Sequence, residues 1–125
     1  MKNAINWFEI PVRDLNRAQS FYEQLFDAPL TPQEPDETGS TMIFFPADLE
    51  NGGIGGCIIS GPGYEPSDKG ALVYLNGGED LSIPLSRVEQ AGGKVIMPKT
   101  SIAPHGFMAL FMDTEGNKLA LQSSN

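Results

Sequence analysis

Side chains able to do chemistry are few in this sequence, and the two most reactive types occur once each. Cys57 is the single cysteine, which excludes an internal disulfide and a cysteine-rich zinc site. His105 is the single histidine, so imidazole can fill at most one metal-ligand position in a chain. The sequence contains no phosphate-binding loop, nucleotide fingerprint or Ser/His/Asp arrangement. These counts already restrict metal chemistry severely.

Glu9 is the acidic residue of most interest, because its neighbours are aromatic and aliphatic. The segment INWFEIPV, residues 5–12, predicts a strand, and strand alternation places Trp7 and Glu9 on one face. The alternate side chains then face a helix: Phe8, Ile10 and Val12. If the face that carries Glu9 lines an apolar, cup-shaped cavity, Glu9 is a candidate general acid or base for proton transfer beside a carbonyl group. The alternatives are a structural ion pair with Lys118 or Arg13, or simple exposure at the mouth of the cup.

Hydrophobic periodicity predicts one domain, residues 1–125, that is built from two modules. Module 1–60 and module 70–125 are joined by a Gly- and Pro-rich linker, 61–69. The predicted elements are a strand at 5–12, a helix at 14–26, a loop at 31–40, strands at 41–47 and 54–60, a strand at 71–75, a helix at 80–91, and strands at 94–98, 106–113 and 118–123.

The two modules resemble one another at a shift of 66 residues. This shift places Asp14 on Asp80 and Phe8 on Tyr74, and each module then contains a strand, a helix and three strands. One helix covers one face of each small sheet, so the uncovered faces are expected to form a cup. The predicted class is α+β, with two βαβββ modules that pair through edge strands into a curved, half-open sheet around a ligand.

Several motifs within these elements are specific. They are VxDL at the first helix entry, the FY and LF pairs in that helix, the AGG stop of the second helix, and DxxGN at 113–117. Together they resemble the vicinal oxygen chelate superfamily of glyoxalase I, bleomycin and fosfomycin resistance proteins, extradiol dioxygenases and methylmalonyl-CoA epimerase. The resemblance covers essentially the whole chain and is greatest to small bacterial glyoxalase-like proteins. It implies the glyoxalase/bleomycin resistance fold and favours a homodimer, whose cup is completed either within one chain or by modules of two chains.

The resemblance also implies four metal-ligand positions, which fall here on Trp7, Ala71, Cys57 and Ala120. Three of these side chains cannot bind a metal, and the fourth offers a single thiol. Catalytic zinc, nickel or iron sites need about three protein ligands. We therefore expect neither a metal nor another cofactor.

Without a metal, the cup is expected to hold a small molecule. Trp7 either stacks on that molecule or fills the space left by the missing ligands, and Lys118 shares the face of the last strand. Tyr64, in the linker, could cover an opening. The predicted ligand-binding residues are Trp7, Glu9, Ala71, Val73, His105, Ala120 and Gln122, and Glu9 is also the catalytic candidate.

Three functions remain open. The first is a metal-independent small-molecule-binding protein of the bleomycin-resistance type. The second is a glyoxalase-like lyase or isomerase that uses Glu9 as acid or base, and the third is a protein with no ligand of its own.

A net charge of -8 speaks against nucleic acid and anionic lipid as partners. The absence of a long apolar run and of a signal peptide predicts a cytoplasmic protein.

Overall fold

The computed structural model describes residues 2–125 and confirms the α+β class with two βαβββ modules. The first sheet has the order β1-β4-β3-β2, in which β1 runs parallel to β4 and the other neighbours are antiparallel. The elements of this module are β1 (Trp7–Pro11), α1 (Leu15–Phe26), β2 (Thr31–Pro32), β3 (Thr41–Phe44), the 3-10 turn η1 (Leu49–Asn51) and β4 (Gly55–Ser60). The short strand β2 lies where only a loop was expected.

The second sheet repeats this topology with the order β5-β8-β7-β6. Again the first strand of the module is parallel to the last, and the remaining pairs are antiparallel. Its elements are β5 (Tyr74–Asn76), α2 (Ser82–Leu85), β6 (Lys94–Ser101), β7 (Phe107–Met112) and β8 (Lys118–Ser123).

The first helix begins and ends as its sequence predicts. The side chain of Asp14 accepts the N–H of Arg17 at 3.0 Å and so caps the helix. Asp27 ends it in the left-handed conformation, with a φ of 51°. Its buried face carries Ala18, Phe21, Tyr22 and Leu25 at the spacing of an amphipathic helix. At 12 residues α1 is the longest helix described, and no helix within residues 2–125 is long and apolar enough to cross a membrane.

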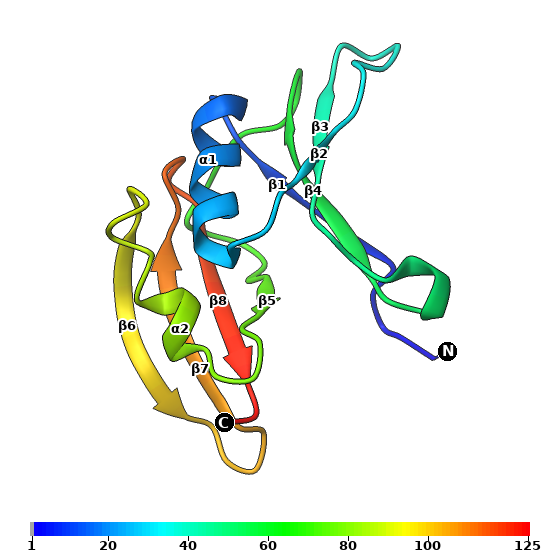
Figure 1. The fold of residues 1–125 in the computed structure, drawn as a ribbon. Helices are drawn as coiled ribbons and strands as arrows, with labels where there is room; N and C mark the ends of the chain where they lie inside the picture. The colour runs from blue at the N-terminus through cyan, green and yellow to red at the C-terminus, as the bar shows by residue number, and fades with distance from the viewer. Residues whose placement is uncertain (1) are drawn as a thin grey trace.

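Both sheets and α1 contribute to one hydrophobic core. Ile58 comes from the first sheet, Leu121 from the second, and the ring centroids of Phe21 in α1 and Phe111 in β7 lie 6.1 Å apart. Figure 1 shows α1 between the two sheets and α2 over the second sheet. Because one face of each sheet meets this core, the other face of each sheet turns away from it. Within residues 2–125 no strand of one sheet pairs with a strand of the other. The two sheets of one chain therefore do not join into the single half-open sheet expected from the sequence.

The second helix is shorter than the sequence predicts. α2 covers only Ser82–Leu85, and turns follow it up to residue 92. Pro84 has no N–H to donate, so the Asp80 carbonyl accepts the N–H of Ile83 at 3.1 Å instead. Leu85 and Ser86 then donate to carbonyls four residues earlier, as in an α-helix. After them Arg87 and Val88 donate to carbonyls only three residues earlier, at 2.9 and 3.2 Å, and such 3-10 geometry is rarely maintained over many residues.

Strand β5 differs by one residue from the expected register. Tyr74 lies opposite Ala120, and Asn76 lies opposite Gln122, so these four side chains share a face. The expectation that Val73 lies on the face of Ala120 is wrong, because Val73 packs against the core. A shift of one residue exchanges the two faces of a strand, and β5 matches β1 at a shift of 67 rather than 66 residues.

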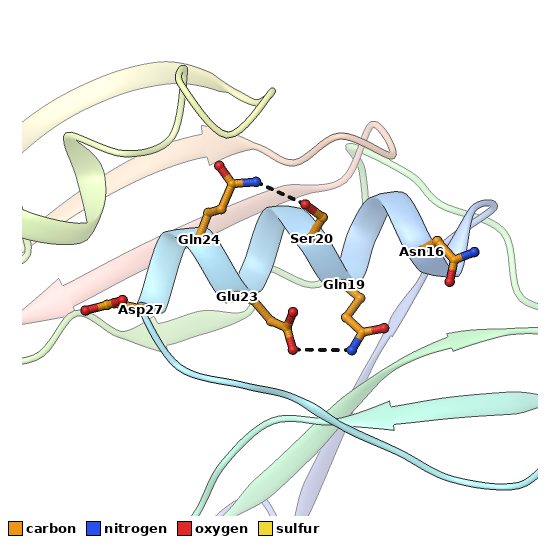
Figure 2. Close-up of a pocket in the computed structure, with 6 residues that line it drawn as sticks. All are labelled: Asn16, Gln19, Ser20, Glu23, Gln24 and Asp27. Carbon is orange, nitrogen blue, oxygen red and sulfur yellow. Dashed lines mark hydrogen bonds between the residues drawn. The ribbon is translucent and has the colours of Figure 1, made fainter.

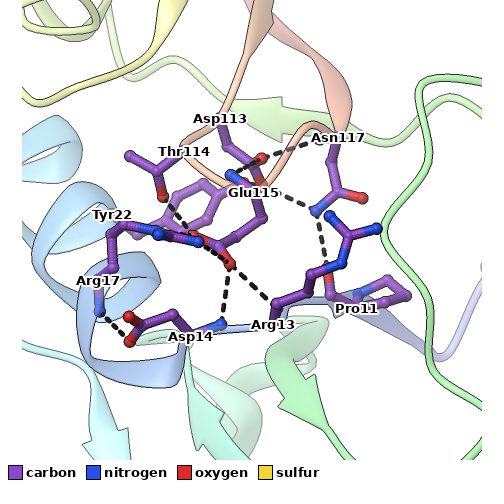
Figure 3. Close-up of polar contacts among 9 residues, drawn as sticks. All are labelled: Pro11, Arg13, Asp14, Arg17, Tyr22, Asp113, Thr114, Glu115 and Asn117. Atoms are coloured by element: carbon purple, nitrogen blue, oxygen red, sulfur yellow. Dashed lines mark hydrogen bonds and ion pairs between the residues drawn. The ribbon is translucent and has the colours of Figure 1, made fainter.

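The DxxGN motif forms a turn that fastens the second module to the first, as Figure 3 shows. Asp113 accepts the Tyr22 hydroxyl at 2.7 Å, and the Asn117 amide donates to the Pro11 carbonyl at 2.8 Å. Glu115 accepts the guanidinium of Arg17 at 2.7 and 3.0 Å. The turn therefore holds the end of β1 and the start of α1, and its role in the structure is to fix one module against the other.

Candidate functional site

The outer face of the first sheet brings aromatic rings together with one carboxylate. Trp7 pairs with Gly55, and Glu9 pairs with Cys57, which in turn pairs with Phe44, so these side chains share a face that we call the Trp7 face. The Trp7 and Phe44 rings meet edge to face, with centroids 5.6 Å apart. A Cβ atom on Gly55 would lie 3.1 Å from the Trp7 ring, so the glycine lets the indole rest on β4. The indole nevertheless remains 39% exposed and available to a ligand.

Glu9 is half-buried and determines the charge of the Trp7 face. Tyr64, from the linker, lies beside Glu9, whose negative charge raises the pKa of the Tyr64 phenol. Burial raises the pKa of the Cys57 thiol to about 12, and the charge of Glu9 adds to the rise. Both groups are therefore protonated at neutral pH. Within residues 2–125 Glu9 forms no ion pair with Lys118 or Arg13.

The residues at the family's metal-ligand positions do not fit a metal. Trp7 and Ala120 offer no donor atom, and Ala71 lies away from both in the groove described below. Cys57 alone offers a donor, but a thiol with a pKa of about 12 is a poor source of the thiolate that a metal needs. Among residues 2–125, no three His, Cys, Asp or Glu side chains gather in a way that could hold a metal ion.

The outer face of the second sheet carries a second group of predicted residues, and we call it the Ala120 face. Gln122 Nε2 donates to the His105 carbonyl at 2.9 Å, which ties the loop before β7 to this face. The His105 side chain is exposed, whereas Ala120 is fully buried. The face comprises Tyr74, Asn76, Met108, Leu110, Lys118, Ala120 and Gln122.

The remaining predicted residues, Ala71 and Val73, line a groove between the two modules. We call it the inter-module groove; its volume is about 990 Å³. Phe8, Phe26 and Phe45 line it from the first module. Trp7 and Glu9 do not line the groove, but Gly55 borders both the groove and the Trp7 face, and Tyr74 and Asn76 border both the groove and the Ala120 face.

A second hollow lies along α1, and Figure 2 shows the side chains that line it. They are Asn16, Gln19, Ser20, Glu23, Gln24 and Asp27. Glu23 accepts the Gln19 amide at 3.2 Å and the Leu30 N–H at 2.8 Å, while Gln24 donates to Ser20 at 3.0 Å. Because these groups bond mainly to one another, the hollow is the solvated polar side of the helix and not a converging binding site.

The structure thus divides the predicted ligand-binding residues among three places. Trp7 and Glu9 lie together, Ala120 and Gln122 lie together with the His105 loop, and Ala71 and Val73 lie in the groove. Phe44, Tyr74 and Asn76 also lie on these two faces but were not among the residues predicted from the sequence. The alternation Val73, Tyr74, Leu75, Asn76 was the signal for the latter two, since aliphatic residues occupy every second position.

The sequence matches known proteins along almost its entire length. Residues 4–121 match the Glyoxalase/Bleomycin resistance protein/Dioxygenase superfamily. A glyoxylase-like domain-containing protein from Didymella fabae is 30% identical over 128 residues, which cover 97% of this chain and 94% of that protein.

Solved structures with the same fold include proteins of different activity. An antibiotic-binding protein from Streptomyces sp. CB03234 superposes with a TM-score of 0.69 at 24% identity, covering 100% of this chain and 99% of that one. Glyoxalase I from Zea mays gives a TM-score of 0.70 at 19% identity over 94% of this chain, which spans only 45% of the maize enzyme. At these identities the structures show the fold alone, whereas the sequence matches show the family. The chain belongs to the glyoxalase/bleomycin resistance protein/dioxygenase superfamily.

Proposed function

We propose that this chain binds a small molecule without a metal, in the manner of the bleomycin-resistance type. The observation that carries the proposal is the Trp7 face, where a partly exposed indole and the Phe44 ring lie on the same face as a single carboxylate, Glu9. Apolar and aromatic walls with a few polar groups are typical of small-molecule sites. The fold shared with an antibiotic-binding protein of Streptomyces supports this choice.

A second copy of the chain completes the site in this proposal. The Trp7 face and the Ala120 face both turn away from the core that their sheets share, so one chain cannot bring them together. Strands β1 and β5 lie at sheet edges, and an edge strand presents backbone groups that can pair with another chain. A homodimer would therefore join the Trp7 face of one copy to the Ala120 face of the other.

Binding is tested by a thermal-shift screen of cationic drugs, aldehydes and aromatic metabolites. Trp7 is the only tryptophan, so its fluorescence reports directly on the site. We expect a compound that raises the melting temperature to quench or shift this emission as well. Trp7→Phe should then weaken binding about tenfold, because truncating an aromatic contact in a binding site costs on the order of 1–2 kcal/mol. A panel in which no compound changes either signal would count against the proposal.

Mixing two damaged variants tests whether the site lies between chains. Trp7→Ala damages one face and Gln122→Lys damages the other, so each homodimer lacks an intact site. A heterodimer of the two has one doubly damaged site and one intact site. Ligand binding that returns after the variants are refolded together supports the two-chain site. Binding that does not return, although native mass spectrometry shows heterodimers, contradicts it.

The position of Glu9 supports a second candidate function, a glyoxalase-like lyase or isomerase. Its half-buried carboxylate lies on the Trp7 face beside the protonated Tyr64 phenol, where it could take a proton from a bound carbonyl compound. Formation of lactoylglutathione, measured with and without added nickel or zinc, tests the lyase reaction. If turnover is found, Glu9→Gln should abolish it and leave substrate affinity nearly unchanged. If no turnover occurs under either condition, this candidate fails and the binding proposal stands.

A further inference from the structure

The two outer faces carry matching residues, because the two modules have the same topology. In the first module Trp7 pairs with Gly55 across the parallel strands β1 and β4. In the second module Tyr74 pairs with Ala120 across the parallel strands β5 and β8. Tyr74 is therefore the counterpart of Trp7 on the Ala120 face.

Both of these rings are exposed and have small neighbours. Trp7 is 39% and Tyr74 is 51% exposed, whereas most aromatic side chains of the chain pack in or against the core. The residue beside each ring on the adjoining strand is small, Gly55 beside Trp7 and Ala120 beside Tyr74. Each ring therefore has surface that a flat molecule can cover.

Both rings also lie at the margin where a second copy would join. β1 is the outermost strand of the first sheet, and β5 is the outermost strand of the second. A two-fold dimer that pairs β1 of one copy with β5 of the other contains this contact twice. At each contact, Trp7 of one copy and Tyr74 of the other line the same joined surface.

A polar side chain follows each ring on the same face. Glu9 lies two residues after Trp7 in β1. Asn76 lies two residues after Tyr74 in β5. Asn76 Oδ1 accepts the N–H of Gly78 at 2.8 Å, which leaves its NH2 group as the remaining donor. The joined faces thus offer a carboxylate acceptor and an amide donor to the substituents of a bound molecule.

We propose that Trp7 of one copy and Tyr74 of the second copy form an aromatic clamp, which selects flat aromatic molecules that carry a hydroxyl or N–H group. The ring of the ligand lies between the indole and the phenol, and its polar group donates to Glu9. Aromatic pairs gain more than the burial of their apolar area, so a flat ring is favoured over a saturated molecule of the same size. This inference rests on the proposed two-chain site and adds the class of ligand and the residue that selects it.

Two ligands that differ in aromaticity test the clamp by calorimetry. 2-Naphthol should bind at least fivefold more tightly than decahydro-2-naphthol, which has the same carbon skeleton and hydroxyl group but no flat ring. Tyr74→Leu keeps an apolar side chain and removes the ring, so it should weaken binding of 2-naphthol about fivefold and of decahydro-2-naphthol less than twofold. Because Tyr74 is exposed, this variant should fold, and its melting temperature provides the check. Ile96→Leu, at an exposed position on β6 at the opposite edge of the same sheet, should change neither affinity.

Heterodimers show whether the two rings come from different chains. Trp7→Leu and Tyr74→Leu each damage both sites of a homodimer, whereas a heterodimer of the two variants has one intact site. Half of the sites in the heterodimer should therefore bind 2-naphthol with wild-type affinity. The clamp is overturned if native mass spectrometry shows heterodimers in which every site stays weak, or if the wild-type protein binds 2-naphthol as a monomer.

The single variants separate a failure of the clamp from a failure of the proposed function. If Trp7→Leu weakens binding of 2-naphthol and Tyr74→Leu does not, the clamp is overturned and the Trp7 face remains the binding site. Equal affinity for the two ligands, or no binding of 2-naphthol, also overturns the clamp, while a hit in the wider thermal-shift screen would still support the proposed function. If both variants keep wild-type affinity, 2-naphthol binds elsewhere and the clamp fails.

Discussion

Glu115 is a buried carboxylate that accepts most of its hydrogen bonds from residues at the start of α1. Its Oε1 accepts the N–H groups of Arg13 and Asp14 at 3.0 and 2.9 Å, and its Oε2 accepts Arg17 at 2.7 Å and the Thr114 hydroxyl at 2.9 Å. Burial by itself raises its pKa, but the hydrogen bonds from Arg17 and the backbone outweigh burial and lower the pKa to about 2. The ionised form is therefore the one that the fold stabilises.

Replacing Glu115 by glutamine should destabilise the protein by about 2 kcal/mol at pH 7, because hydrogen bonds to a charged group are stronger than those to an amide. The folded pKa of about 2 lies below the ordinary 4.5, so the contribution is complete above about pH 4.5 and is lost as the pH falls toward 2. Urea unfolding of both proteins should thus converge at low pH. Glu37→Gln, in an exposed loop, is the control and should unfold like the wild type at pH 7. A difference that does not depend on pH would contradict the role of the charge.

Tyr74 shows why single residues of the site were harder to predict than strands. Alternation along β1 and β8 correctly placed Ile10, Leu119 and Leu121 in the core, because each run has a clear apolar face. The alternation of Val73, Tyr74, Leu75 and Asn76 is a weak signal for the buried face, because residues 71 to 75 are all apolar or aromatic and only Asn76 is polar. The inward face was chosen from Ala71, the residue at the family's second metal-ligand position, and this choice was off by one residue. The resulting error exchanged Tyr74 for Val73.

Among the secondary-structure elements, the bounds of α1 could be predicted from the sequence, but the sheets against which it packs could not. Its amphipathic spacing and its bounds are local features, and both were readable from the sequence, although the left-handed Asp27 that ends it was not singled out. That α1 packs against both sheets depends on contacts with residues about 90 positions away, such as the hydrogen bond of Tyr22 to Asp113. The length of α2 was also misjudged, because nothing in the apolar spacing of residues 80–91 signals that the hydrogen bonds shorten to three-residue spacing at Arg87 and Val88.

Removing the Tyr22 hydroxyl tests how α1 is fastened to the second module. Tyr22→Phe leaves the Asp113 carboxylate buried with one donor fewer, which should cost about 1–3 kcal/mol in the free energy of unfolding. Hydrogen exchange should then accelerate at the 113–117 turn and at the first turn of α1. Tyr64→Phe removes a hydroxyl from the linker tyrosine and serves as the matched control. A loss of the same size in both variants would argue that the hydroxyl on α1 has no special role.

At the scale of the molecule, the shared core explains how the chain can be two modules in sequence and one body in structure. The sequence predicted each module separately, because strands and helices are largely local. It left open whether the cup forms within one chain or between two, because a cup between two sheets and a core between two sheets use the same alternating strands. What decides between them is whether the helix-facing residues of the second sheet also contact α1, and Phe111 does so.

This relation predicts that the two modules unfold together. Phe111→Leu, in the second module, should lower stability by about 1–2 kcal/mol, because a ring in a shared core is replaced by a smaller side chain. Trp7 lies in the first module, yet its fluorescence should report the same lowered urea midpoint as the circular dichroism of the whole chain. Ile96→Ala, at a position 45% exposed on β6, should leave both midpoints unchanged. If the Trp7 transition kept its wild-type midpoint while the circular dichroism shifted, the modules would be independent, and the shared core would not couple them.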